Sequence, residues 1–153
     1  METETKEQIK QTVDNFFVAA GLNGRIAALE EVDGGILIKI ESQEAGYLIG
    51  RDGETLRAIQ QLLRGIVSRK TAEAVRLTLD VNDYQSEKVK ALVLAAQNLA
   101  QEVARSGAGR SLPPMNAYER RAVHTALAEI AGVKTESEGE GENRRIAIKP
   151  INN

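Results

Sequence analysis

The chain is expected to fold as two small α+β domains in tandem, and three observations predict this. Apolar residues recur at helix and strand spacings in the order α-β-β-α-α-β over residues 4–81. Asn82-Asp83 then opens a second set of helices and strands. A length of 153 residues suffices for one or two modest cores. We therefore expect one domain over residues 1–81 and a second over residues 82–153.

The elements of the first domain follow from hydrophobic periodicity and from turn residues. Gly21 ends the first helix, and Asp33-Gly34-Gly35 is a hairpin turn signal between two strands. The helices are expected to cover one face of a three-stranded sheet. The expected elements are a helix over about 4–20, strands over 25–32 and 36–40, a helical turn over 43–48, a helix after residue 53, and a strand over 75–81.

The helix after residue 53 is expected to be amphipathic. Its core-facing stripe consists of Leu56, Ile59, Leu62, Leu63, Ile66 and Val67. Its opposite, polar face consists of Arg57, Gln60, Gln61, Arg64 and Ser68.

The second domain is expected to place helices against a small sheet. A long helical pattern covers about 84–105, and the prolines after Leu112 favour an extended segment. Asn116 is a good helix N-cap, and Glu119, three residues later, can complete a capping box. Strands over 133–138 and 144–149 are expected to pair across a glycine-containing turn.

Composition excludes several kinds of site. The chain has no cysteine and one histidine, which rules out disulfides, thiolate zinc sites and histidine-rich metal sites, so no cofactor is expected. Aromatic residues make up only 3% of the chain, too few for a row of base-stacking rings. No apolar run is long enough to span a bilayer, and a cytoplasmic protein without membrane contact is expected.

The charge is small and unevenly distributed. The net charge is −2, with −3 over residues 1–81 and +1 over residues 82–153. Because indiscriminate nucleic-acid binders normally carry a basic surplus, any such site here must be a local patch.

The tetrad Gly50-Arg51-Asp52-Gly53 is the first candidate site. Two glycines three residues apart let the backbone turn tightly and approach a ligand. At the start of a helix, free backbone N–H groups can bind a phosphate. Arg51, Arg57 and Arg64 add cations along a nucleic-acid strand, and Ile49 offers an apolar surface to bases. The alternative is a tight turn between two helices without a ligand.

Arg120 and His124 form the second candidate site. They lie four residues apart on one expected helix and so share a face. Arg121, Arg144 and Arg145 lie nearby if the C-terminal hairpin packs against this helix. The proposed role is a phosphate-binding patch of arginine and histidine. The alternative is an ordinary surface or partly buried histidine.

Catalysis has little support in the sequence. No cysteine nucleophile exists, and the serines show no triad-like setting. A Gly-x-x-x-x-Gly-Lys-Ser/Thr loop for nucleotide hydrolysis is absent. No catalytic residue and no metal ligand is therefore assigned, and the chain is not expected to be an enzyme.

Four segments together resemble a known family. GYLIGRDGETLRAIQQLL (46–63) and VRLTLDVNDY (75–84) resemble the KH domain of the bacterial Jag proteins, also called KhpB or EloR. LPPMNAYERRAVHTAL (112–127) and VKTESEGEGENRRIAIKP (133–150) resemble their second, R-three-H domain. Many members carry a further N-terminal domain with a basic linker, whereas this chain is expected to begin almost at the KH domain.

The resemblance implies what the chain binds and where. It implies a regulator that binds single-stranded RNA, or alternatively single-stranded DNA, through the Gly50–Gly53 loop and the Arg120/His124 site, with Arg144 and Arg145 matching a basic pair of the family. Family members influence cell elongation, division or sporulation, and some pair with a small KH-only partner protein. The competing hypothesis is a protein-interaction hub in which RNA binding is incidental.

Overall fold

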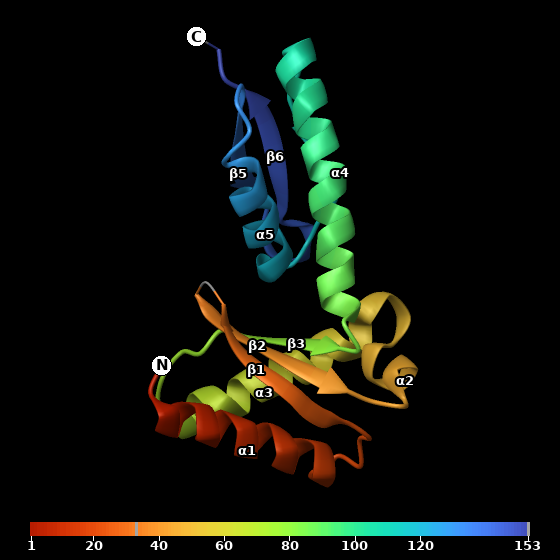
Figure 1. Ribbon diagram of the computed structural model, residues 1–153, viewed down its shortest axis with the longest axis vertical. Helices are drawn as coiled ribbons and strands as arrows, with labels where there is room; N and C mark the ends of the chain where they lie inside the picture. The colour runs from red at the N-terminus through yellow and green to blue at the C-terminus, as the bar shows by residue number, and fades with distance from the viewer. Residues whose placement is uncertain (33, 153) are drawn as a thin grey trace. The chain divides into compact units, whose positions relative to one another are not determined.

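The computed structural model describes residues 1–32 and 34–152, and the chain divides into two units, Met1–Gln85 and Ser86–Asn153. Each unit combines helices with one three-stranded sheet, which confirms the predicted α+β class (Figure 1). No helix among the described residues is long and apolar enough to cross a bilayer.

The first unit follows the predicted order α-β-β-α-α-β. Its elements are α1 (Thr3–Ala19), β1 (Arg25–Val32), β2 (Gly35–Glu41), α2 (Ala45–Ile49), the 3-10 turn η1 (Arg51–Gly53), α3 (Glu54–Thr71) and β3 (Leu77–Val81). The expected turn residue Asp33 lies outside the described residues.

The sheet of the first unit has the order β1-β2-β3. β1 runs antiparallel to β2, and β2 runs parallel to β3. The carboxyl ends of β2 and β3 therefore lie at the same end of the sheet. The long helices α1 and α3 lie side by side across one face of the sheet, as predicted (Figure 1).

The core of the first unit forms between these helices and the sheet. It is built by α1, β2, α3 and β3, with Leu48 of α2 at its margin. Its fully buried members include Ile9, Ile36, Ile38, Leu63, Leu77 and Leu79. Apolar residues of α1 and α3 face the sheet, which explains why they recur at helical spacing in the sequence.

The prediction of which α3 residues face the core is partly wrong. Leu56, Ile59, Leu63 and Val67 are buried as predicted, but the side chain of Leu62 is 58% exposed. A helix buries a limited arc, and Leu62 lies outside it.

Two polar residues of α3 contact the sheet instead of facing away from it. Gln60 Oε1 accepts a hydrogen bond from the Leu79 N–H at 2.9 Å, and Arg64 Nε donates to the Leu77 carbonyl at 2.8 Å. β3 is an edge strand, so its outer N–H and C=O groups have no neighbouring strand. Gln60 and Arg64 satisfy part of that edge.

The second unit contains most of the long helix α4 and the elements after it. These are α4 (Tyr84–Ser106), β4 (Arg110–Ser111), α5 (Ala117–Leu127), β5 (Val133–Glu138), the 3-10 turn η2 (Gly141–Asn143) and β6 (Arg145–Pro150). The sheet order is β4-β6-β5, with both pairings antiparallel. The segment expected to be only extended thus supplies a third, two-residue strand.

The predicted capping box at the start of α5 is confirmed. The Glu119 N–H donates to Asn116 Oδ1, and the Asn116 N–H donates to Glu119 Oε2, both at 2.9 Å. The Glu119 side chain is nearly fully buried and also forms an ion pair with Lys88 Nζ on α4 at 3.0 Å. This carboxylate therefore ties α5 to α4 beside a core formed by α4, α5, β5 and β6.

Candidate nucleic-acid interface

The Gly50–Gly53 tetrad makes the turn between α2 and α3. Gly50 has φ +70° and ψ −173°, Asp52 has φ +51° and ψ +28°, and Gly53 has φ +77° and ψ +14°. Positive φ is readily adopted by glycine and is tolerated by aspartate better than by most other residues. This conformation explains Asp52, whose side-chain type suits a left-handed position.

Glycine is required at position 50 because a side chain would collide with its neighbours, as well as because of the backbone angle. A Cβ at this position would lie 2.2 Å from Thr55 Oγ1 and 2.8 Å from Thr55 Cβ. A Cβ at Gly53 would lie 3.4 Å from the Tyr84 ring, which is an ordinary contact. Gly50 thus lets the loop fold back onto the first turn of α3, whereas at Gly53 the positive φ, more than the surrounding space, favours glycine.

The first turn of α3 has backbone N–H groups to which a ligand can hydrogen-bond. The Glu54 N–H donates to the Arg51 carbonyl, and no side chain in the described parts of the chain caps this helix start. The N–H groups of a helix's first turn lack intrahelical acceptors and carry a partial positive charge. Such a terminus is suited to an anion.

The three predicted cations of the tetrad region differ in their surroundings. Arg51 is exposed within the loop. Arg57 is exposed, and its Nη1 donates to the Asp52 carbonyl at 3.2 Å, which supports the loop. Arg64 is half-buried against β3, and burial, followed by repulsion from Arg76, lowers the pKa of its guanidinium. Arg51 therefore lies within the tetrad and Arg57 contacts it, whereas Arg64 contacts the sheet.

Two apolar residues border the tetrad. Ile49 packs partly against the core, which leaves part of its surface exposed. Tyr47, two residues earlier on α2, has a side chain that is 79% exposed. Sequence reasoning did not single out Tyr47, although its position three residues before Gly50 was a usable signal. An exposed ring at this position can stack on a base.

In the second unit, α5 and the hairpin bring Arg120, His124 and Arg144 together with two hydroxyl groups. His124 Nδ1 is hydrogen-bonded to Thr135 Oγ1 on β5. Arg144 Nε donates to Ser137 Oγ at 3.3 Å.

Arg120 is held in place beside these groups. Its Nη1 donates to the Met115 carbonyl at 2.6 Å. Burial, followed by repulsion from Arg144, lowers the pKa of Arg120. The two guanidinium groups are therefore close enough to repel each other, which favours a shared anion between them.

Arg145 is separated from this group by the pleat of the hairpin. Its Nε donates to Glu138 Oε1 at 2.9 Å, and the two residues face each other across β5 and β6. The neighbouring pair Ser137 and Ile146 projects to the other face, because successive strand residues alternate. Arg121 is half-buried on α5.

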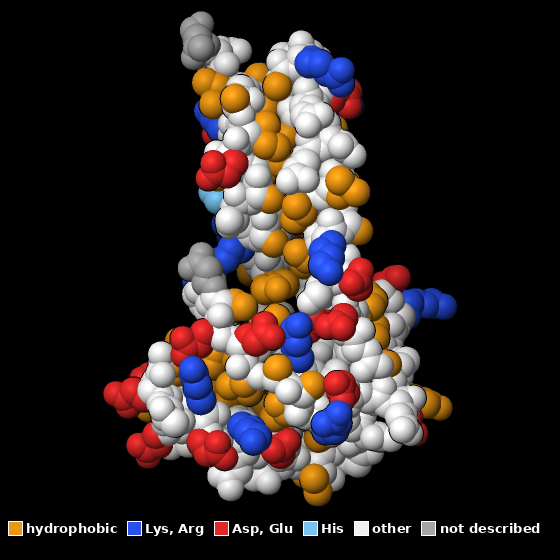
Figure 2. All heavy atoms as spheres, viewed as in Figure 1, with side chains coloured by type: hydrophobic (Ala, Val, Ile, Leu, Met, Phe, Trp, Pro, Cys, Tyr) orange, Lys and Arg blue, Asp and Glu red, His pale blue; other side chains and the backbone are white. Residues whose placement is uncertain are grey.

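The charges of the first unit do not form one basic surface. Figure 2 shows lysine and arginine side chains interspersed with aspartate and glutamate on its visible face. The described residues include no group of three or more histidine, cysteine or carboxylate side chains that could hold a metal ion. Local hydrogen-bonding geometry, more than overall charge, therefore sets the two candidate sites apart from the rest of the surface.

Comparison with known families matches both units. Residues 6–79 match the KH domain of KhpA/KhpB, and residues 90–150 match the R-three-H domain. Both are binding modules and not enzyme domains, in agreement with the sequence prediction. The two domains occur in the predicted order.

Three curated relatives illustrate the similarity, each named RNA-binding protein KhpB. The Clostridium symbiosum protein is 35% identical over 111 residues, which are 72% of this chain and 50% of that protein. The Streptococcus pneumoniae protein is 28% identical over 146 residues (95% and 43%), and the Bacillus subtilis protein is 33% identical over 111 residues (71% and 53%). The chain thus spans about half the length of these relatives. Through its tandem KH and R-three-H domains, the chain belongs to the family that its motifs resemble, the bacterial Jag or KhpB proteins.

Proposed function

We propose that the chain binds single-stranded RNA through two sites, the Gly50–Gly53 loop and the Arg120/His124/Arg144 group. The observation that carries the proposal is the geometry of the loop. Gly50 folds against Thr55, and the first turn of α3 has no side-chain cap among the described residues. The names of the relatives support RNA as the ligand.

At the first site, the backbone amides of the loop hold a phosphate of the strand, and Arg51 and Arg57 supply the positive charge. Ile49 and the exposed ring of Tyr47 contact the bases next to that phosphate. Amides and two arginines neutralise few phosphates, so binding at this site depends on backbone geometry more than on charge.

At the second site, a phosphate lies between Arg120 and Arg144, whose mutual repulsion it relieves. The Met115 carbonyl and the Ser137 hydroxyl hold the two guanidinium groups in position. His124 is oriented by Thr135 through Nδ1, which leaves its other ring nitrogen available to the strand. Arg121 adds positive charge on the same helix.

The biological role that we propose is post-transcriptional regulation in the cytoplasm, linked to cell elongation, division or sporulation. A small KH-only protein is the proposed partner. Single-stranded DNA is the alternative ligand, and competition between RNA and DNA oligonucleotides of one sequence separates the two.

The decisive experiment uses Gly53, because a Cβ there makes only an ordinary contact with the Tyr84 ring. Gly53→Asp introduces a carboxylate at the proposed phosphate site, and Gly53→Asn introduces the same shape without charge. Both residue types tolerate positive φ. We expect fluorescence anisotropy with labelled single-stranded RNA to show at least about tenfold weaker binding for Gly53→Asp than for Gly53→Asn. Equal affinities of folded Gly53→Asp, Gly53→Asn and wild-type protein would overturn the clamp.

A second candidate function is a protein-interaction hub that contacts its partners through exposed apolar side chains of the first unit. Val18 on α1, Tyr47 on α2 and Leu62 on α3 are 81%, 79% and 58% exposed. Crosslinking in cells followed by nuclease treatment separates the two functions, because a hub keeps its protein partners after RNA is destroyed.

A further inference from the structure

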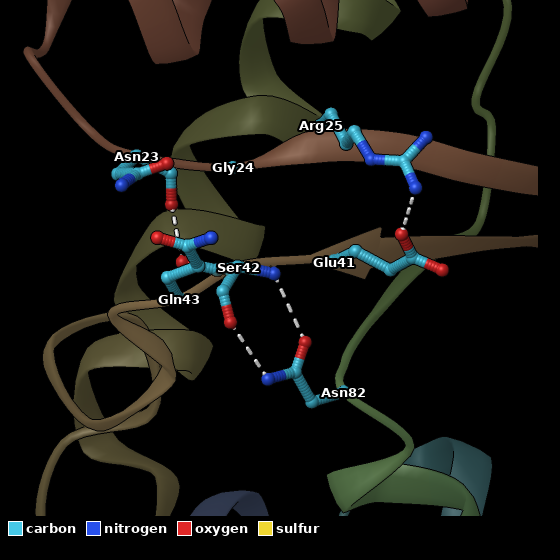
Figure 3. A pocket seen from close by; sticks show the side chains of 7 residues that line it. All are labelled: Asn23, Gly24, Arg25, Glu41, Ser42, Gln43 and Asn82. Atoms are coloured by element: carbon cyan, nitrogen blue, oxygen red, sulfur yellow. Dashed lines mark hydrogen bonds and ion pairs between the residues drawn. The ribbon is translucent and has the colours of Figure 1, made fainter.

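A polar pocket of about 510 Å³ lies at one end of the first unit's sheet (Figure 3). Its walls come from the segment before β1, the end of β2 and the residue after β3. The side chains that matter here are those of Asn23, Arg25, Glu41, Ser42, Gln43 and Asn82. The volume is within the usual range for small-molecule sites.

The floor of the pocket is rigidly held. Asn82 Oδ1 accepts from the Ser42 N–H at 3.0 Å, and Asn82 Nδ2 donates to the Ser42 carbonyl at 2.8 Å. The Ser42 hydroxyl in turn donates to the Asn23 carbonyl. Asn82 itself has φ +48°, a left-handed conformation that the paired amide helps to maintain. Hydrogen bonds therefore join the three segments that line the pocket.

Two side-chain amides at the pocket remain available. Those of Asn23 and Gln43 make no hydrogen bond to any residue that the structure describes, whereas both ends of the Asn82 amide are occupied (Figure 3). Arg25 and Glu41 form an exposed ion pair at the rim. No aromatic ring is among the described residues that line the pocket. Its chemistry thus favours a ligand that is read by hydrogen bonds at its edge.

The pocket and the Gly50–Gly53 loop lie at the same end of the sheet. Ser42 follows β2 and Asn82 follows β3, and these two strands run parallel. From the end of β2 the chain continues through α2 to the loop. From the end of β3 it continues to Tyr84, whose ring lies against Gly53.

The distance between the two features is short. The Cα atoms of Asn82 and Tyr84 are two residues apart, which is at most about 7 Å. The carboxyl ends of parallel strands are a common place for ligands in open sheets. A strand held at the loop is therefore within reach of the pocket.

We propose that this pocket is a nucleobase subsite, in which Asn23 and Gln43 bind the hydrogen-bonding edge of one base of the RNA strand held at the Gly50–Gly53 loop. This inference rests on the proposed function. An amide offers a donor and an acceptor side by side, and adenine presents a matching pair on both of its accessible edges. The subsite therefore prefers adenine.

The test compares two double variants, each of which replaces one asparagine and one glutamine by alanine. Asn23→Ala with Gln43→Ala removes the two available amides of the pocket. The matched control, Gln11→Ala with Asn15→Ala, removes two exposed amides of α1. Affinities of wild type and both variants are measured for A, C, G and U homo-oligoribonucleotides of one length.

We expect the wild type to bind oligo(A) most tightly. The pocket variant should lose about fivefold or more of its affinity for oligo(A) and little for the other three, while the control variant keeps the preference. Since the amides carry no charge, the dependence of affinity on salt should be the same in all three proteins.

Two results would overturn the subsite. One is a wild type that binds oligo(A) no better than the other oligonucleotides, and the other is a pocket variant that keeps its preference for oligo(A). Failure of the proposed function is distinguishable, because the wild type would then bind none of the four. If Gly53→Asp abolishes binding while the pocket variant keeps its adenine preference, only the subsite is wrong.

Discussion

Arg64 Nε donates a hydrogen bond to the carbonyl of Leu77 at 2.8 Å, so a residue of the polar face of α3 lies against the edge of β3. Arg57 lies seven residues earlier on the same face of the helix and contacts the loop carbonyl of Asp52. Two arginines with equivalent positions in the helical pattern thus have different surroundings. This difference separates a role in the fold from a role in binding.

Replacing each arginine by methionine should affect a different property, stability for Arg64 and RNA binding for Arg57. Arg64→Met leaves the Leu77 carbonyl without its partner, and we expect a loss of about 1 kcal/mol in the free energy of unfolding. Arg57→Met should change stability little but lower the slope of log affinity against log salt by about 1. Urea denaturation and a salt series of RNA binding measure the two effects. Equal changes of the salt slope in both variants would contradict this assignment.

The contact between Gly50 and Thr55 predicts a strong effect of a single methyl group. Gly50→Ala places a Cβ 2.2 Å from Thr55 Oγ1 at a φ of +70°, so the loop must move. We expect a loss of about 1–3 kcal/mol in stability, together with weaker RNA binding. Gly46→Ala and Gly65→Ala are the controls, because a Cβ at either position meets no atom within 4 Å. These two variants should be neutral or slightly stabilising, since alanine favours a helix.

Periodicity and turn residues predicted most of the fold. The order of helices and strands in the first domain and the capping box at Asn116 both follow from local chemistry, and the structure confirms both. These features depend on neighbouring residues in the sequence, where spacing alone decides which groups meet.

Contacts between distant segments were not predictable in the same way. Leu62 fits the apolar stripe of α3, yet no element of the first unit covers it enough to bury it. The 79% exposure of Tyr47 depends on how α2 packs, which spacing in the sequence does not decide. The hydroxyl partners Thr135 and Ser137 come from a strand, and which face of the hairpin meets α5 depends on its register.

The register of the hairpin predicts that two adjacent arginines differ in binding. Arg144 lies with Arg120, whereas Arg145 is paired with Glu138 on the other face. Arg144→Ala should weaken RNA binding and flatten its salt dependence, and Arg145→Ala should change neither by a measurable amount. Filter binding between 50 mM and 200 mM salt is suitable for the comparison. A flatter slope in Arg145→Ala would show that the strand also contacts the outer face of the sheet.

Two glutamates of β5 predict how the second unit responds to acid. The Lys149 ammonium, which donates a hydrogen bond to Glu136, holds the pKa of that carboxyl below its ordinary value of 4.5. The Ser111 hydroxyl, followed by Arg145, lowers the pKa of Glu138 in the same way. Groups with a lowered folded-state pKa stabilise the protein above pH 4.5, and this contribution is lost as the pH falls through the folded-state value.

The double variant Glu136→Gln with Glu138→Gln should therefore show a shallower loss of stability between pH 5 and pH 3 than the wild type. Glu140→Gln with Glu142→Gln is the control, because these turn residues form no ion pair with described residues. Urea denaturation followed by NMR signals of residues 133–150 reports on this unit alone. An acid response of the β5 variant identical to that of the wild type would reject these two carboxylates as its source.

The buried carboxylate of Glu119 predicts a large loss of stability when it is replaced. It accepts from the Asn116 N–H at 2.9 Å and pairs with Lys88 at 3.0 Å, with only 2% of the residue exposed. Glu119→Ala leaves Lys88 without this partner and removes half of the capping box, so we expect a loss of about 3 kcal/mol. Asn116→Ala removes only the other half and should lose about 1 kcal/mol.

A double-mutant cycle with Lys88→Met and Glu119→Gln isolates the ion pair from the cap, because glutamine keeps an acceptor for the Asn116 N–H. We expect a coupling energy of about 1 kcal/mol or more, since one partner is buried. Urea denaturation monitored by NMR signals of residues 117–127 provides the four free energies. Strictly additive effects would show that the Lys88–Glu119 ion pair contributes nothing to the stability of this unit.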